Sequence, residues 1–151
     1  MKKTLSLLLA LCFLLSLPLG GIAEDAARYA PEDIDLDLAD LSGTLVYAQI
    51  YQMANEPENY IDKVIRLSGW YEVFQDSSTG LVYTSCYIPD ASACCAQGIE
   101  FVWAGDHAYP DDYPEPGTGL IVTGRFETYV EDGWMYMHLV DAEVVWLPEA
   151  Y

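Results

Sequence analysis

Apolar and polar residues alternate along most of the chain after residue 62, which is the pattern of half-buried β-strands. The segments that carry this pattern cover residues 64–75, 81–88, 99–103, 120–130 and 134–147. Residues 76–80 and Glu131-Asp132-Gly133 have the composition of tight turns, and the Pro-rich segment 104–118 predicts a loop. On three of the strands, alternate residues are expected to face one core: Ile65, Leu67, Tyr71, Val73, Val82, Thr84, Cys86, Ile88, Leu120, Val122, Phe126 and Val130.

A helical period precedes the strands. Val46, Ile50 and Met53 recur at i, i+4 and i+7, so the segment 44–54 is predicted to form a helix with one buried stripe. The helix is expected to stop before Pro57, because a residue that precedes proline avoids the helical conformation. The pattern as a whole predicts a mainly β domain with an N-terminal α-helix.

Two of the predicted strands share one pattern, namely apolar-x-apolar-hydroxyl-Gly-x-aromatic-Glu-x-aromatic, at residues 65–74 and 120–129. The glycines of this pattern, Gly69 and Gly124, lie in mid-strand, where glycine usually marks a bend or a bulge. Long bent strands allow a small sheet to close on itself. We therefore expect a five-stranded Greek-key barrel of the OB type, with a small open β-sandwich as the alternative.

The pattern of the first 23 residues predicts a secretory signal peptide. A basic start at Lys2 and Lys3 leads into an apolar run over residues 5–19, and small residues precede Glu24. The apolar run is short for a membrane span, and the Pro and Gly residues at its end break a helix, so an uncleaved anchor is the less favoured alternative. We expect a secreted or cell-envelope protein that retains no stable membrane span after cleavage.

The chain carries a large negative charge, which argues against some classes of binding partner. The 151 residues include 24 Asp or Glu and 6 Lys or Arg, for a net charge of −18. Removal of residues 1–23 leaves four cationic side chains against the same 24 acidic ones, a net charge of −20. Nucleic-acid binding depends on neutralising phosphates with Lys and Arg, so the composition argues against a nucleic-acid partner.

Seven acids lie within residues 24–43. Residues 33–38 alternate in polarity, but repulsion between their carboxylates is expected to oppose a stable strand. We therefore predict an acidic flexible arm over residues 24–43, followed by a helix-plus-barrel domain over residues 44–151.

Three groups of residues give the chain a resemblance to a known family. They are the run from Asn55 through Lys63 to Tyr71, the segment 90–101 with its Cys94-Cys95 pair, and the Val122-x-Gly124-x-Phe126 pattern. Residues 55–147 resemble OB-fold domains of secreted or envelope proteins from Gram-positive bacteria. Among named families they resemble the C-terminal domain of a zinc-regulated permease-subunit family. The resemblance implies an OB fold, an extracytoplasmic location and a link to zinc, and it implies no particular activity.

The cysteines allow several interpretations. Beyond residue 23 the chain has Cys86, Cys94 and Cys95, an odd number for an exported protein. Cys86 fits a core position on its strand, whereas the adjacent pair follows a predicted turn at Asp90. Zinc is the one cofactor that these residues suggest, with Cys94, Cys95, Asp90 and His107 as candidate ligands. A disulfide from Cys86 to Cys94 or Cys95 and simple burial of all three thiols are the alternatives.

No arrangement of residues in the sequence favours catalysis. The two histidines, His107 in the loop and His138 on the last strand, are interpreted as surface and partly exposed positions. Glu72 and Glu127 occupy equivalent places on the two similar strands and are a candidate for the paired carboxylates of a hydrolase. The interpretation that we favour is that both carboxylates face solvent.

Aromatic residues occupy the strand faces that are not assigned to the core. They are Trp70, Phe74, Tyr129, Trp134 and Tyr136, of which Trp70, Trp134 and Tyr136 are the candidate ligand-binding residues. Aromatic platforms on OB folds bind sugars or nucleic acids, and the charge leaves a sugar or a protein as the ligand. We favour instead the interpretation that the helix 44–54 covers one outer face of the barrel and so buries these residues. We expect an exported, non-catalytic binding or accessory module, with a thiolate zinc protein as the alternative.

Overall fold

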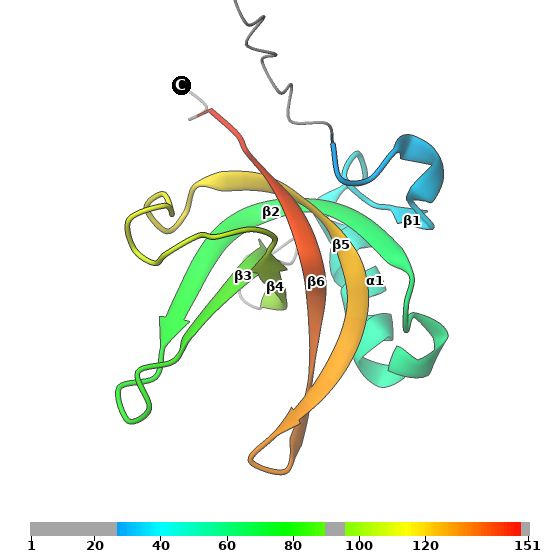
Figure 1. Cartoon of the computed structure of the whole chain (residues 1–151). Helices are drawn as coiled ribbons and strands as arrows, with labels where there is room; N and C mark the ends of the chain where they lie inside the picture. Colours follow the sequence, from blue (N-terminus) through cyan, green and yellow to red (C-terminus); the bar gives the residue numbers. More distant parts are fainter. Residues whose placement is uncertain (1–26, 90–95, 149–151) are drawn as a thin grey trace, which may run out of the picture.

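Five long strands form the body of the protein, and one helix packs against them (Figure 1). The computed structural model describes residues 27–89 and 96–148. After a short 3-10 helix at Pro31–Asp33, the elements follow in this order: β1 Leu36–Asp37, α1 Gly43–Asn55, a 3-10 helix Pro57–Asn59, β2 Val64–Gln75, β3 Val82–Pro89, β4 Ala96–Trp103, β5 Gly119–Glu131 and β6 Trp134–Trp146. The predicted signal peptide, residues 1–23, lies outside the described residues.

The six strands form one mixed sheet in the order β1-β2-β3-β4-β6-β5, and a further pairing of β2 with β5 turns the last five into a ring. The ring is not evenly closed. β5 and β6 pair along their whole length, from Leu120↔Trp146 to Glu131↔Trp134. β4 and β6 run parallel and pair only within Glu100–Trp103. The prediction of a mainly β fold with an N-terminal helix is confirmed.

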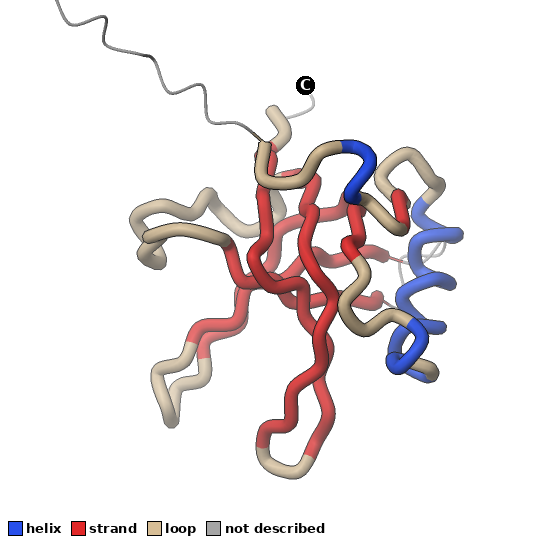
Figure 2. Tube along the Cα trace, turned by 45° about the vertical axis from the view of Figure 1, so that its right-hand side comes forward, coloured by secondary structure: helices blue, strands red, loops and turns tan. Residues whose placement is uncertain are grey.

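The helix contributes its predicted stripe to the core. Val46, Ile50 and Met53 are the buried residues of α1, and they join the same apolar cluster as the inward faces of the strands. Figures 1 and 2 show α1 on one side of the ring and the loop 104–118 on the opposite side. Within residues 27–89 and 96–148, no helix has the length and apolar character needed to cross a bilayer.

The inward faces of the strands agree with the alternation of the sequence except at Val82, which is half-buried outside the core cluster, and at Val130. Ile65, Leu67 and Tyr71 on β2 are fully buried, as are Val122 and Phe126 on β5. Tyr113 of the loop 104–118 stacks on Tyr71 with ring centroids 5.9 Å apart. Val130 was expected in the core but is 72% exposed. It lies near the tip of the β5–β6 hairpin, beyond Arg125, the last residue of β5 that pairs with β2.

Both mid-strand glycines lie where two strands approach closely. A Cβ atom on Gly69 would lie 2.6 Å from Cys86 Sγ and 2.7 Å from the Tyr87 carbonyl oxygen. A Cβ atom on Gly124 would lie 2.9 Å from Leu139 Cβ, and the register between β5 and β6 shifts at this point. These contacts leave no room for a side chain, which explains why the shared pattern has glycine there.

The described part of the acidic arm is bound to the ring, so the expectation that repulsion prevents a strand here is wrong. Leu36–Asp37 pair in parallel with β2, and Leu38 is 2% exposed. Two of the carboxylates have partners that offset their repulsion. Asp35 Oδ2 accepts a hydrogen bond from the Val64 amide at 2.9 Å, and Asp37 forms an ion pair with Arg66 at 3.0 Å.

Candidate ligand-binding groove

A groove with a volume of about 530 Å³ lies over the outer faces of β3 and β4. Tyr83 and Ser85 of β3 and Gly98 and Glu100 of β4 line its floor, because they alternate with residues that face the core. The β2–β3 hairpin and the β5–β6 hairpin form its walls, and the C-terminal end of α1 contributes Met53. Its lining comprises Met53, Ala54, Pro57, Phe74, Asp76, Tyr83, Ser85, Gly98, Glu100, Thr128, Tyr129, Glu131, Asp132, Met135, Tyr136 and Met137.

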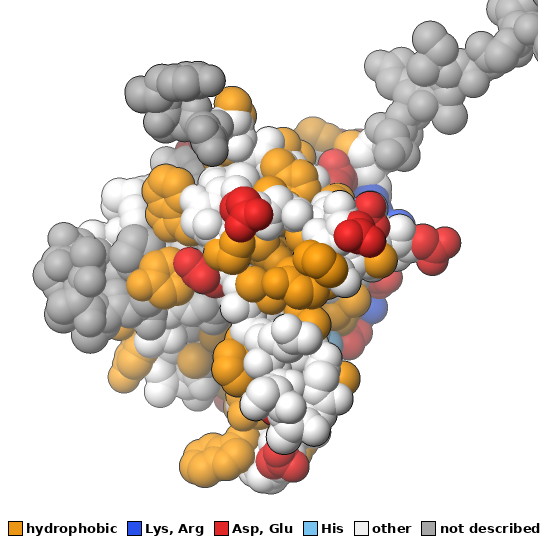
Figure 3. All heavy atoms as spheres, turned by 90° about the vertical axis from the view of Figure 1, so that its left-hand side faces the viewer, with side chains coloured by type: hydrophobic (Ala, Val, Ile, Leu, Met, Phe, Trp, Pro, Cys, Tyr) orange, Lys and Arg blue, Asp and Glu red, His pale blue; other side chains and the backbone are white. Residues whose placement is uncertain are grey.

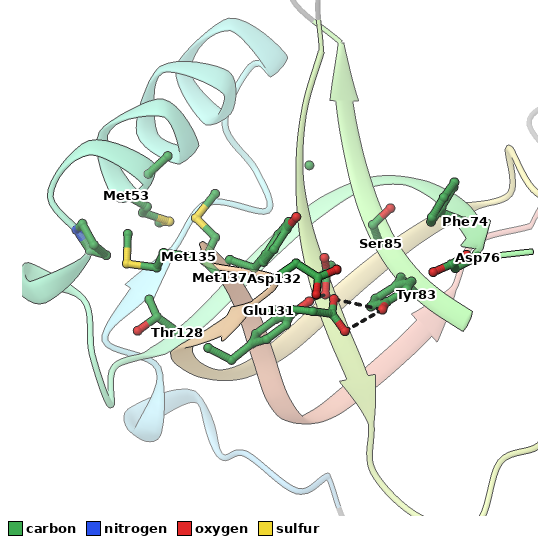
Figure 4. A pocket seen from close by; sticks show the side chains of 16 residues that line it. Met53, Phe74, Asp76, Tyr83, Ser85, Thr128, Glu131, Asp132, Met135 and Met137 are labelled. Atoms are coloured by element: carbon green, nitrogen blue, oxygen red, sulfur yellow. Dashed lines mark hydrogen bonds between the residues drawn. The ribbon is translucent and has the colours of Figure 1, made fainter. Parts of the chain in front are cut away.

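Two tyrosine hydroxyls hold two carboxylates inside the groove. The Tyr83 hydroxyl donates to both carboxylate oxygens of Glu131 at 2.9 Å, which joins β3 to the far hairpin (Figure 4). The Tyr129 hydroxyl donates to Glu100 Oε2 at 2.6 Å. These bonds leave lone pairs on each carboxylate available for a ligand, since a carboxylate accepts about four hydrogen bonds.

The electrostatics of these groups reflect their closeness. Burial raises the pKa of Glu100, the hydrogen bond from Tyr129 partly opposes the shift, and the charge of Glu131 adds to it. The pKa of Tyr83 rises to about 12, mainly because its hydroxyl donates to Glu131. The charges of Asp76 and Glu100 also contribute to this shift, so several acids act on one point of the groove.

Aromatic rings and methionines complete the lining. Tyr129 and Tyr136 stack with centroids 5.4 Å apart, and Phe74 lies tilted against Tyr83 at 6.2 Å. Figure 4 shows Met53, Met135 and Met137 gathered at one end of the groove and Tyr83, Phe74 and Asp76 toward the other. The groove therefore has an apolar end and an acidic, aromatic end.

The aromatic residues predicted to bind ligand divide between separate places. Tyr136 lines the groove, whereas Trp134 is 72% exposed on the hairpin beside it, paired with Glu131. Trp70 lies in a different cavity, near Ser68 and Ile88. The expectation that α1 covers these residues is wrong, because Trp70, Phe74, Trp134 and Tyr136 remain exposed. The helix instead turns the apolar stripe of Val46, Ile50 and Met53 into the core.

Of the three cysteines beyond residue 23, Cys86 lies within the described residues. Cys86 is fully buried, and burial raises the pKa of its thiol to about 12, in agreement with a core position. Asp90, Cys94 and Cys95 lie outside the described residues, so the zinc and disulfide alternatives stay predictions. His107 is exposed and stacks on Trp103 with centroids 3.6 Å apart. Within the described ranges, no three Cys, His, Asp or Glu side chains gather in a way that suits a metal ion.

Glu72 and Glu127 do not form the carboxylate pair of a hydrolase. In one direction around the ring they belong to one lateral row, in which β3, β4 and β6 lie between them. In the other direction β2 and β5 pair directly, but the pairing runs from Trp70↔Gly119 to Val64↔Arg125, so Glu72 and Glu127 lie beyond its opposite ends. At about 4.8 Å for each step between neighbouring strands, the separation of the two carboxylates along the row far exceeds the roughly 5–9.5 Å between the paired carboxyl groups of a glycosidase.

The two glutamates have different surroundings. Glu72 is exposed, as expected of a solvent-facing position. Glu127 is half-buried and forms an ion pair with Arg125, which also contacts Asp62 and Asp141 at 3.3 Å. His138, whose side chain is 17% exposed, sits 3.9 Å from Glu127, and burial lowers its pKa.

Sequence reasoning missed the main acidic residues of the groove, Glu100 and Glu131. Their signal was present in the alternation, because Tyr83, Ser85 and Glu100 are polar positions of apolar strands. Recognising a site required knowing that β3 and β4 are neighbours and that the β5–β6 hairpin reaches over them. Comparisons with protein-family models and with curated proteins find no match to this chain.

Proposed function

We propose that this chain is an exported, non-catalytic binding module built on an OB-type barrel, and that the groove over β3 and β4 is its ligand site. The observation that carries the proposal is the groove itself, about 530 Å³ in volume and lined by aromatic and acidic side chains. This volume is within the range of ligand sites in proteins, roughly 300–1,000 Å³.

The strand order supports the OB-type assignment. Five strands in the cyclic order β2-β3-β4-β6-β5, with β4 and β6 parallel, fit a Greek-key barrel whose second and third strands are β3 and β4. OB folds bind their ligands on those two strands, between the loop that precedes them and the loop of the last hairpin. The groove occupies the corresponding place in this chain.

The bonding of the groove carboxylates supports binding rather than catalysis. Glu100 and Glu131 each accept a tyrosine hydroxyl, so both are held in fixed positions by neutral donors. Such an arrangement suits the recognition of a ligand. Glu72 and Glu127, the pair for which the sequence suggested hydrolysis, are separated by three strands.

Gly98 offers a direct test of the groove. A Cβ atom at Gly98 meets only the Cys86 carbonyl oxygen, at 3.5 Å, so a larger side chain there extends into the groove without disturbing the strand. Gly98→Leu is expected to block binding. Val102→Leu is the matched control, since Val102 is exposed on the same strand outside the groove.

The measurement is a binding screen of the full chain against neutral oligosaccharides and peptides, repeated with both variants. The proposal expects at least one ligand whose binding Gly98→Leu abolishes and Val102→Leu leaves intact. Ligands that bind Gly98→Leu as well as the wild type, in every case, would refute the groove as the site.

Export is the second part of the proposal and rests on the order of basic, apolar and small residues in the segment 1–23. Intact-mass analysis of the protein recovered outside the cell is expected to give a chain that begins near Glu24. A mass that includes residues 1–23 would contradict cleavage, and retention in the cytoplasm would contradict export.

A further inference from the structure

Among the described residues that line the groove, the negative charge has no positive counterpart. Four of its lining residues are acidic and none is Lys, Arg or His: Asp76, Glu100, Glu131 and Asp132. Arg125 is the cation on the neighbouring strand, but its guanidinium is already held by Asp62, Glu127 and Asp141. A neutral ligand would leave this negative charge uncompensated, whereas a cation would be attracted to it.

The groove is polarised along its length. Met135 and Met137, which lie over the buried Met53, form one end, and Figure 4 shows Glu131 and Asp132 next to them, followed by Tyr83 and Asp76. A lysine or arginine side chain has the same polarity, because its aliphatic stem is apolar and only its tip is charged. The stem fits the methionines, whose flexible thioethers adapt to varied apolar groups.

The aromatic rings add a second attraction for a cation. Tyr129 and Tyr83 line the groove beside the carboxylates of Glu100 and Glu131, to which their hydroxyls donate, and Tyr136 stacks on Tyr129. The face of a tyrosine ring attracts an ammonium or a guanidinium group, and the attraction grows when the cation is partly removed from water. Carboxylates and aromatic faces thus favour the same kind of ligand.

The rim of the groove indicates that the cation belongs to a protein. Phe74 is 66% exposed and Met135 54%, so a large apolar side chain of the groove lining is exposed on each of the two hairpins. Aromatic residues and methionine are enriched at protein interfaces, where a partner covers them. Figure 3 shows another trait of the surface, with hydrophobic and acidic side chains interspersed on one face and Lys and Arg only toward its edge.

From these observations we infer that the groove receives a lysine or arginine side chain from a basic segment of a partner protein. The aliphatic stem lies on the methionine end, and the charged tip lies between Glu100 and Glu131. The inference rests on the proposed function, because it specifies the ligand of the same groove.

Calorimetric titration of the full chain tests this inference. The probe is a blocked nonapeptide with three lysines, and the comparison probes are the same peptide with glutamine at those positions, spermidine, and a neutral oligosaccharide. Glu100→Gln and Glu131→Gln remove one charge each while keeping an oxygen that accepts the tyrosine hydroxyl. Glu72→Gln is the matched control, since Glu72 is exposed on β2 outside the groove.

The lysine peptide is expected to bind and the glutamine peptide to fail. Each groove variant is expected to weaken binding about tenfold, the usual effect of losing one charged hydrogen-bond partner. Glu72→Gln is expected to leave the affinity unchanged. All three variants are expected to melt within a few degrees of the wild type, so that weaker binding does not reflect unfolding.

Four results would overturn the inference. Equal weakening by Glu72→Gln would show attraction to the acidic surface in general. Stronger binding of spermidine than of the peptide would assign the groove to a free polyamine. Binding of the neutral probes alone, blocked by Gly98→Leu, would keep the proposed binding function and refute the cationic ligand. Failure of the lysine peptide to bind would refute the inference, while the screen with Gly98→Leu separately decides the proposed function.

Discussion

Replacing Gly69 by alanine tests whether the ring is closed by strands that approach each other closely. The added methyl group would lie 2.6 Å from Cys86 Sγ, 2.7 Å from the Tyr87 carbonyl oxygen and 3.3 Å from Ile88 Cγ1. Carbon atoms in proteins rarely approach other heavy atoms so closely, so something in β2 or β3 must move. Gly69 also pairs with Leu120 of β5, so a shift of β2 disturbs two neighbouring strands.

The two short contacts differ in how easily they relax. Cys86 Sγ ends a short side chain and is packed in the core, whereas the Tyr87 carbonyl belongs to a backbone held by pairing with Trp70 and Gly98. Overpacking of this kind costs about 1–3 kcal/mol. For a domain of this size, each kcal/mol lowers the melting temperature by roughly 4 °C. Gly69→Ala is therefore expected to melt about 4–12 °C below the wild type.

Gly98→Ala is the matched control for this experiment. Gly98 also lies in mid-strand beside β3, but its Cβ atom would meet only the Cys86 carbonyl oxygen, at an ordinary 3.5 Å. Alanine there removes the backbone freedom of glycine from the unfolded chain, so it should be neutral or stabilise by up to about 1 kcal/mol. The difference between the two variants isolates the close approach from the general effect of replacing glycine.

Thermal unfolding followed by circular dichroism is the assay, with chemical denaturation as a check on the free energy. A second variant, Cys86→Ala, removes the sulfur that the new methyl group meets. Combined with Gly69→Ala, it should recover part of the loss but not all of it, because the Tyr87 carbonyl remains. If Gly69→Ala melts at or above the wild type while Gly98→Ala behaves as expected, the close contact between β2 and β3 is refuted.

Three further predictions concern single groups. Because burial raises the pKa of the Cys86 thiol to about 12, peptide mapping after treatment of the native chain with iodoacetamide at pH 8 should find this residue unmodified until denaturant is added; modification without denaturant would contradict its burial. The raised pKa of Glu100 means that the folded state holds a proton there more tightly than the unfolded state, so the carboxylate costs stability as the pH rises from about 4.5 through the raised pKa. Glu100→Gln should therefore raise the melting temperature relative to the wild type more at pH 7 than at pH 4, and an equal difference at both would refute the shift. On the zinc hypothesis, metal bound to chain purified without chelator under reducing conditions should be lost when Cys94 and Cys95 are both changed to Ser and kept in Cys86→Ser; equal zinc in the double variant and the wild type would remove the hypothesis.

The sequence by itself determined the elements and their buried sides, because these depend on neighbours a few residues apart. The spacing of Val46, Ile50 and Met53 is a property of one helix, and it places the stripe that the structure buries. The bounds of β2 match the alternating segment 64–75. Asp132 and Gly133 take positive φ angles of 51° and 84° in the predicted turn, as a tight hairpin requires.

Only the tertiary structure decided which outer faces meet. Tyr83 and Glu131 are 48 residues apart in the sequence and become hydrogen-bonded in a sheet where β6 lies between β4 and β5, out of chain order. The same order separates Glu72 from Glu127, although their places on the two similar strands are equivalent. The alternation along a strand predicts which side of that strand is polar. It does not predict which polar sides become neighbours, because that depends on how the whole ring buries its core.

Residues near the ends of the elements also show that burial depends on the tertiary structure and not on the local pattern alone. Val130 has the spacing of a core residue but lies where the hairpin extends past the ring, so nothing covers it. Leu38 lies among carboxylates that repel one another, yet it is buried, because Arg66 and the Val64 amide bind Asp37 and Asp35 beside it. The local sequence pattern indicates whether a residue favours a buried or an exposed position. Its actual burial and the compensation of its charge depend on partners that only the folded chain brings close.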